Sequence, residues 1–139
     1  MNETSKMPPP FALSVGVCDL LYRDRGTGKR FILGCFSTIH AKLFPVKHPA
    51  LGVYLDLTNG RGQVSIKVQI IDSDEDREPI WTTELEFDFS DPRMVAELDF
   101  MVGGLEFPEP GEYRVQAFAN GEFIIERRLL LIRVETKNE

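Results

Sequence analysis

The feature that most constrains the fold is an alternation of apolar and polar residues with a period of two. It is clearest in the segment 80–89, where one face of a predicted strand carries Trp81, Thr83, Leu85, Phe87 and Phe89. The opposite face carries Thr82, Glu84, Glu86 and Asp88, so one side of the strand is expected in the core and the other in water. No apolar repeat of helical period lasts for three turns. We therefore expect strands and no long helix.

Turn residues divide the chain into eight alternating segments. The expected strands are 11–22, 30–39, 51–57, 63–71, 80–89, 93–102, 112–119 and 122–134, with 40–52 as a loop or crossover. The segment 93–102 also fits a short helix, but its continued alternation favours a strand. The pattern predicts an all-β fold, a two-layer antiparallel β-sandwich of about eight strands with immunoglobulin-like or related Greek-key topology.

The first predicted hairpin brings the two cysteines of the chain together. Its turn is centred between Gly26 and Thr27, so that residue i pairs with residue 53 − i and Cys18 lies opposite Cys35. The Cβ atoms of such a pair are about 4.5–5.5 Å apart. Two interpretations remain open: a redox-linked pair, or two small core residues on one face of the sheet.

The strongest turn signal is Asn120-Gly121, because a type I′ turn requires positive φ at both central residues. Pairing about this turn sets Phe118 opposite Phe123 and Ala117 opposite Ile124. The inward residues of the preceding strand are expected to be Tyr113, Val115, Ala117 and Ala119. In the last strand the inward residues are expected to be Ile124 and later Leu130, Ile132 and Val134, and the interruption by Glu126 and Arg128 is explained either by a bulge near residues 126–128 or by local exposure.

Length, charge and the N-terminus exclude several classes of protein. We expect a disordered lead-in at 1–10, a single domain at 11–135 and a flexible tail at 136–139. The net charge of −6 argues against nucleic acid, which binds to basic surfaces. No apolar run is long enough to span a membrane, and the start of the chain lacks the pattern of a secretory signal. We therefore expect a cytoplasmic protein that binds neither nucleic acid nor membranes.

Three acidic residues in one turn, Asp72, Asp74 and Asp76, form the best candidate for a metal site. Calcium is bound by clustered carboxylates on flexible loops. The turn fails the EF-hand pattern, because Arg77 stands where that loop has glycine and Thr83 where it has glutamate. An exposed acidic turn without a metal is the other interpretation, and we favour it.

Other constellations give little sign of catalysis. His40 and His48 flank the proline-containing segment, but zinc needs three or four ligands and no spacing gathers the cysteines beside them. Glu84 and Glu86 share one face of a strand, where an acidic row usually serves solubility. Ser37, Thr38 and His40 are close in sequence, but alternation puts Ser37 on the opposite face from Thr38 and His40, and no G-x-S-x-G motif is present. We therefore expect no catalytic residue, no cofactor and no enzyme.

Three segments together resemble a known family. They are C-D-L-L-Y with G-K-R-F-I-L-G-C-F-S-T-I at 18–39, F-P-V-K-H-P-A-L at 44–51, and G-L-E-F-P-E-P-G-E-Y-R-V with N-G-E at 104–122. The most specific motifs are Phe44-Pro45-x-x-His48-Pro49 and Phe107-Pro108-x-Pro110-Gly111-x-Tyr113. The chain resembles an uncharacterised bacterial family of small β-sandwich proteins, a domain of unknown function. The resemblance covers nearly the whole chain after Pro10, and it implies the fold but no activity or ligand.

The function expected from the sequence is that of a non-enzymatic interaction module, which binds a protein partner or associates with itself as a homodimer. Phe118 and Phe123 are the candidate contact residues, provided that they point away from the core. The alternative is a calcium-dependent or small-ligand domain that binds carbohydrate. In that case the acidic turn would hold calcium, and the sugar would stack on Trp81, Tyr54 and Tyr113.

Overall fold

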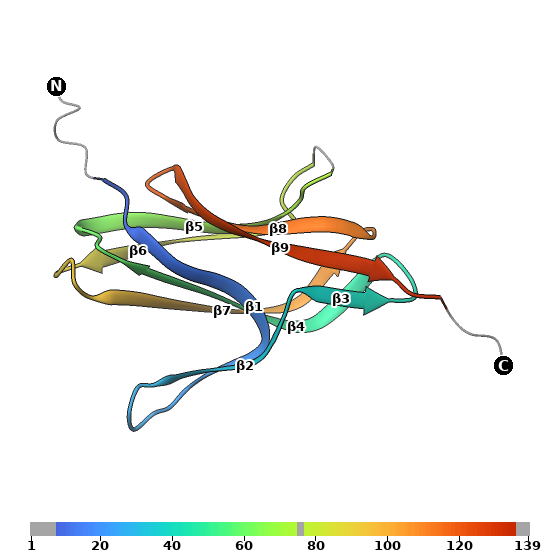
Figure 1. Cartoon of the computed structure of the whole chain (residues 1–139), viewed down its shortest axis with the longest axis horizontal. Coiled ribbons are helices and arrows are strands. Elements are labelled where there is room, and N and C mark those ends of the chain that lie inside the picture. The colour runs from blue at the N-terminus through green and yellow to red at the C-terminus, as the bar shows by residue number, and fades with distance from the viewer. Residues whose placement is uncertain (1–7, 75–76, 136–139) are drawn as a thin grey trace.

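The computed structural model describes residues 8–74 and 77–135, and these residues form nine strands in two layers (Figure 1). The strands are β1 (Phe11–Arg23), β2 (Arg30–Phe36), β3 (Thr38–Ala41), β4 (Val46–Thr58), β5 (Gly62–Asp72), β6 (Trp81–Phe89), β7 (Val95–Phe107), β8 (Gly111–Ala119) and β9 (Glu122–Arg133). Most of the lead-in expected at 1–10 and all of the tail expected at 136–139 lie outside the described residues. Pro10 is described and buried, so packing begins one residue before the predicted boundary.

The strands form a four-stranded sheet that packs face to face against a five-stranded sheet. The first sheet has the order β2-β1-β4-β7, and the second has the order β3-β9-β8-β5-β6. Neighbouring strands are antiparallel except for β3 and β9, which are parallel. The prediction of an all-β, two-layer sandwich is confirmed. The expectation that it is antiparallel throughout is wrong at the β3–β9 pair.

The segment predicted as one strand at 30–39 is two strands that belong to different sheets. The chain leaves the first sheet after Phe36 and joins β9 of the second sheet at Thr38. Ser37 lies between them, and its carbonyl accepts a hydrogen bond from the N–H of Leu130 over 2.9 Å. Both parts are extended and share the same alternation, so the change of sheet leaves no mark in the hydrophobic pattern.

Inward-facing residues of the central strands form one core. The buried side chains of β5 are Val64, Ile66, Val68 and Ile70, and those of β8 are Tyr113, Val115, Ala117 and Ala119. The apolar face of the edge strand β6 is half-buried, and Trp81 packs edge-on against Phe100 of β7 with 5.9 Å between ring centroids. Each fully buried large apolar side chain stabilises the fold by roughly 1.5–3 kcal/mol. The predicted inward faces of these three strands are therefore confirmed.

Two strands of the first sheet are longer than predicted. β4 begins at Val46, inside the segment expected to be a loop, and β7 continues through the glycines at 103–104 to Phe107. Pro49 lies within β4 at a position that has no partner in the ladder with β7, and β1 pairs with β4 only from Gly52 onward. Its missing N–H therefore costs the sheet no hydrogen bond.

The turn between β8 and β9 has the predicted geometry. Both central residues have positive φ, 50° at Asn120 and 84° at Gly121, and Phe118 pairs with Phe123. The side-chain oxygen of Asn120 also accepts a hydrogen bond from the N–H of Ser65 over 2.9 Å, which ties the turn to β5.

The bulge in β9 lies next to this turn rather than near residues 126–128. Ala117 pairs with Ile125 instead of Ile124, because Ile124 is the extra residue. Every later residue of β9 therefore faces opposite to the prediction. The buried residues are Leu129 and Leu131, and the outward ones are Leu130 and Ile132, while Val134 follows the end of the strand.

Tyr113 closes the corner that leads into β8. Its hydroxyl donates to the carbonyl of Glu109 over 2.6 Å and accepts from the N–H of the same residue over 3.2 Å. The ring packs edge-on against Phe107 with 5.1 Å between centroids. Burial raises the pKa of this phenol above its ordinary value.

Tyr113→Phe is expected to lower the free energy of unfolding by about 1–2 kcal/mol, because the backbone of Glu109 loses its partner. The folded state keeps the phenol neutral, so its contribution is full below the unfolded pKa of about 10 and is lost as the pH rises through the raised folded pKa. Urea unfolding at neutral pH and at a series of alkaline pH values measures both effects. An alkaline loss of stability equally steep in the variant would contradict this role.

Candidate functional site

The β1–β2 hairpin pairs in the register predicted from its turn. Partners follow residue i with residue 53 − i from Val17–Phe36 to Arg23–Arg30, and Cys18 lies opposite Cys35. Both thiols are free. Cys18 is buried, and its pKa is raised by burial and by the neighbouring Cys35, whereas Cys35 is exposed. The interpretation of two core residues is therefore right for Cys18 and wrong for Cys35.

The far end of this hairpin bends over the outer face of the first sheet. Arg23 of β1 forms ion pairs with Glu97 and Asp99 of β7, each at 2.7 Å. β4 lies between β1 and β7, so in a flat sheet two strand spacings, about 10 Å, would separate the two backbones. β1 pairs with β4 only as far as Cys18, so the hairpin leaves the sheet there, and in Figure 1 it extends outside the two layers.

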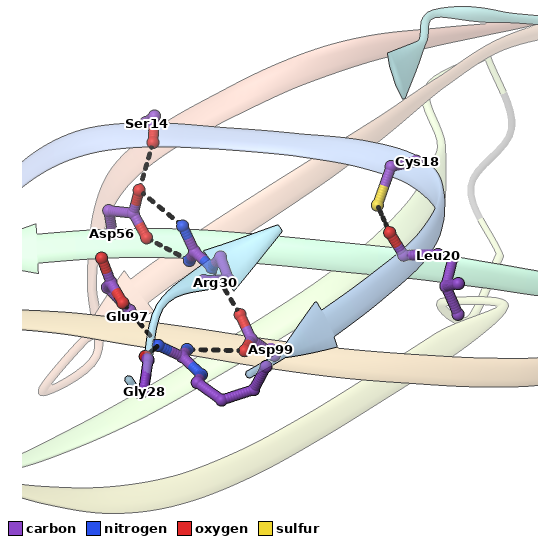
Figure 2. Close-up of polar contacts among 9 residues, drawn as sticks. Ser14, Cys18, Leu20, Gly28, Arg30, Asp56, Glu97 and Asp99 are labelled. Atoms are coloured by element: carbon purple, nitrogen blue, oxygen red, sulfur yellow. Dashed lines mark hydrogen bonds and ion pairs between the residues drawn. The ribbon is translucent and has the colours of Figure 1, made fainter. Parts of the chain in front are cut away.

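Arg30, the first residue of β2, is the centre of the polar contacts that hold the hairpin. Its side chain is only 6% exposed and binds Asp56 of β4 and, at 2.8 Å, Asp99 of β7 (Figure 2). Asp56 also accepts a hydrogen bond from Ser14 over 2.8 Å. Burial opposes the charge of Arg30, but the hydrogen bonds with the two carboxylates outweigh it and raise the pKa. The permanently charged guanidinium thus joins β2 to two other strands.

Tyr54 lies under this network and covers a glycine. A Cβ atom at Gly16 would lie 2.3 Å from the Tyr54 hydroxyl, so only glycine leaves room for the ring across the strand pair. The guanidinium carbon of Arg30 is 5.6 Å from the centroid of the same ring. Burial and the contact with Cys35, at 4.0 Å from its hydroxyl, raise the pKa of Tyr54. The side chain of Arg30, the ring of Tyr54 and the backbone of Gly16 therefore stack on one another at the base of the hairpin.

The other face of the hairpin points to solvent and is apolar. Four large side chains, each 47–51% exposed, form two cross-strand pairs, Leu20 with Leu33 and Tyr22 with Phe31. The rings of Tyr22 and Phe31 are 5.9 Å apart at their centroids. We call these four residues the hairpin patch. Sequence reasoning missed it, although the correct register already placed all four on one face.

Phe118 and Phe123, the predicted contact residues, lie on the outer face of the second sheet. Ala117 is buried and Phe118 is half-buried on the outer side, so the alternative in which the two phenylalanines face the core is wrong. Phe123 is 52% exposed, and the two rings are 5.9 Å apart. The ammonium group of Lys67 lies 5.2 Å from the centroid of Phe118. Their role as contact residues stays a prediction.

The acidic turn is tied into the fold by its first residue. Asp72 is buried and accepts a hydrogen bond from the N–H of Asp74 over 3.1 Å, and Arg77 lies 3.7 Å from its other oxygen. Asp76 lies outside the described residues. Among residues 8–74 and 77–135, no three histidine, cysteine or acidic side chains are placed to hold a metal ion. Calcium binding by this turn stays a prediction.

The family motif Phe44-Pro45-x-x-His48-Pro49 forms the entry to β4 and one wall of a shallow pocket. The Phe44–Pro45 peptide bond is cis, and Arg133 lies over the Phe44 ring, 5.4 Å from its centroid. The pocket has a volume of about 360 Å³ and is lined by Asp19, Gly34, Cys35, Phe36, Thr38, Ile39, His40 and His48. The expectation that the cysteines stay apart from the histidines is thus wrong for Cys35, because the change of sheet at Ser37 brings β2 and β3 together there.

The aromatic residues proposed to stack on sugar do not share a surface. Tyr113 is buried in the core, and Trp81 packs inward against Phe100. Tyr54 lies on the outer face of the other sheet, beneath Arg30. The structure therefore does not bring these three residues together.

Among residues 8–74 and 77–135, no helix is long and apolar enough to cross a membrane.

These features define an all-β, two-layer sandwich that carries a hairpin packed on its outer face. Residues 13–132 match the model of a family described as a family of unknown function (DUF6941), and the chain belongs to this family. The predicted membership of a family of unknown function is thus confirmed. A comparison with curated proteins found no match.

One solved structure with a similar segment is a β-glucosidase from Erythrobacter marinus. The superposition has a TM-score of 0.44 and 19% sequence identity, and it covers 86% of this chain. This chain spans 15% of the length of that enzyme.

Proposed function

We propose that the protein is a non-enzymatic interaction module that binds a protein through its hairpin patch. One observation carries the proposal: Leu20, Tyr22, Phe31 and Leu33 gather four half-exposed apolar side chains on one face of a hairpin. Apolar side chains scattered singly are normal on a surface, but a contiguous group on a fixed support is typical of a binding site. The ion pairs of Arg23 and Arg30 on the opposite face provide that support.

The finer features of the proposal are an immunoglobulin-like topology, a bacterial origin and a cytoplasmic location. The order β1-β4-β7 in one sheet and β9-β8-β5-β6 in the other corresponds to A-B-E and G-F-C-C′ of an immunoglobulin sandwich. The hydrogen bond from Tyr113 to the carbonyl of Glu109 matches the tyrosine corner of that fold. The free thiols at Cys18 and Cys35 support a reducing compartment.

The proposal is tested by capturing partners of the tagged protein from its host and identifying them by mass spectrometry. The purified partner is then titrated against the wild type and against Tyr22→Asp. We expect the variant to bind at least about tenfold more weakly with an unchanged melting temperature, because a charge would enter the contact.

Leu43→Asp is the matched control, since Leu43 is 78% exposed and lies away from the hairpin, in the connection between β3 and β4. It should bind like the wild type. Equal affinity of wild type and Tyr22→Asp for every captured partner would refute the hairpin patch as the binding surface.

A further inference from the structure

We propose that the partner of the hairpin patch is a second copy of this chain, which receives the patch on the outer face of its second sheet. The inference rests on the proposed function, in that both use the hairpin patch. It adds the identity of the partner and the surface that receives the hairpin. The contact would be head to tail, with two different surfaces meeting.

The hairpin offers apolar side chains followed by positive charge. Beyond the pair Tyr22–Phe31, the connection to the next strand carries the exposed residues Arg25 and Lys29. Arg23 and Arg30 turn the other way, toward the first sheet, where Glu97, Asp56 and Asp99 pair with them. The connection also holds Asp24, so its two cations and one carboxylate give a net charge of +1, although the whole chain has a net charge of −6.

The outer face of the second sheet carries aromatic and negatively charged side chains that complement those of the hairpin. One row across four strands runs from Phe123 of β9 through Phe118 of β8 and Lys67 of β5 to Glu84 of β6. Exposed Glu86 and Asp88 continue the negative charge along β6. Two aromatic rings are thus followed, in the direction of the sheet edge, first by Lys67, whose ammonium group lies by the Phe118 ring, and then by a row of carboxylates.

The distances between aromatic and charged residues on the two surfaces are compatible. Strands in a sheet are about 4.8 Å apart, so the two steps from Phe118 to Glu84 cover about 10 Å. β1 ends at Arg23 and Arg25 lies in the turn that follows, so the backbones of Tyr22 and Arg25, three residues apart, are separated by at most about 10 Å. A hairpin that lies across the strands with its end toward β6 would place aromatic on aromatic and guanidinium on carboxylate.

The positions of the two surfaces prevent the contact from forming within one molecule. The hairpin leaves the sandwich on the side of the first sheet, and the receiving row lies on the outer face of the second sheet (Figure 1). A second molecule can therefore present its receiving row to the hairpin of the first and leave its own hairpin available. Contacts of this kind continue into a ring or an open chain of molecules.

The size of the surface predicts a weak association. Two half-exposed aromatic side chains and two half-exposed leucines offer roughly 400 Å², against about 800 Å² on each partner in a standard interface. We therefore expect monomers at low micromolar concentration and larger species at high micromolar concentration.

Sedimentation velocity over this concentration range, on the full chain, tests the proposal with Tyr22→Asp and Phe123→Asp. Each variant removes one of the two surfaces, and both changed residues are about half exposed, so melting temperatures should be retained. Each variant alone should be monomeric. An equimolar mixture should form a dimer and nothing larger, because the intact hairpin of one variant fits the intact row of the other.

A mixture that stays monomeric, or a Phe123→Asp variant that still associates like the wild type, would overturn the head-to-tail contact. The second result would indicate a symmetric dimer through two hairpins. A wild type that is monomeric at all concentrations would refute self-association. The proposed function would survive that result if Tyr22→Asp still lost a captured partner of different sequence. Tyr22→Ser and Phe123→Ser replace any aspartate variant that fails to fold.

Discussion

Leu131→Asp is expected to unfold the domain, whereas Ile132→Asp is expected to leave it folded. Leu131 is 2% exposed and its neighbour in β9 is 40% exposed, so the two changes send the same carboxyl group into the core and into water. The buried change loses the apolar contact and must keep a carboxyl group neutral, which together cost about 5 kcal/mol or more. That cost is comparable to the whole stability of a typical domain.

Urea unfolding followed by circular dichroism and by the fluorescence of Trp81 measures this difference. Ile132→Asp should change the free energy of unfolding by less than about 1 kcal/mol. The pair of variants tests the bulge directly, because a β9 without a bulge would keep Ala117 opposite Ile124 and would bury Ile132 in place of Leu131. A stable Leu131→Asp beside an unfolded Ile132→Asp would show that β9 presents its other face to the core.

Arg30→Met is expected to be the second most damaging change, with a loss of about 3–5 kcal/mol, because it leaves Asp56 and Asp99 without their common cation. Methionine retains most of the apolar stem, so the loss reports on the charge. Arg93→Met is the matched control. Its ion pair with Asp91 involves a side chain that is 90% exposed, and we expect a loss of less than about 0.5 kcal/mol.

The Arg30 variant should also release the hairpin from the sheet. Amide hydrogen exchange in residues 17–36 should become faster than in β5 and β8, since the ion pairs are what holds the curled end in place. Adding Asp56→Asn should recover part of the lost stability, because it removes the carboxylate that has lost Arg30, whereas Asp99 keeps its ion pair with Arg23. Arg30→Met with a loss as small as that of Arg93→Met would disprove the role of the network.

Local signals in the sequence were sufficient for the strands and for two hairpins. The turn at Gly26–Thr27 fixed the pairing of Cys18 with Cys35, and Asn120-Gly121 fixed that of Phe118 with Phe123. Both registers depend on residues within a few positions of the turn, where backbone preference and alternation act together.

Features that depend on distant residues could not be predicted. The bulge at Ile124 decides which face of β9 is buried, yet the segment 122–134 has apolar residues on both faces. The change of sheet at Ser37 depends on the availability of β9, whose paired residues come about ninety positions later. In both cases the local hydrophobic pattern fits two structures equally well, and contacts with distant residues decide which of them forms.

Only part of the candidate site could be predicted from the sequence. The register placed the hairpin patch on one face, but which face meets solvent depends on Asp56 and Asp99, which lie 26 and 69 residues from Arg30. The pairing of Phe118 with Phe123 was predicted because their turn was recognised, and their role as contact residues stays a prediction. The pocket with Cys35 and His48 was missed, since it forms only where the four strands β1 to β4 converge.

The position of β3 has a consequence for how the chain is made on the ribosome. The first hairpin emerges early, but its anchoring carboxylates extend to Asp99, and β3 finds its partner only at residues 130–133. Loops this long are slow to close, and the apolar surface between them stays uncovered meanwhile. The nascent domain can therefore complete its second sheet only when β9 is available, and we expect its cotranslational folding to finish late.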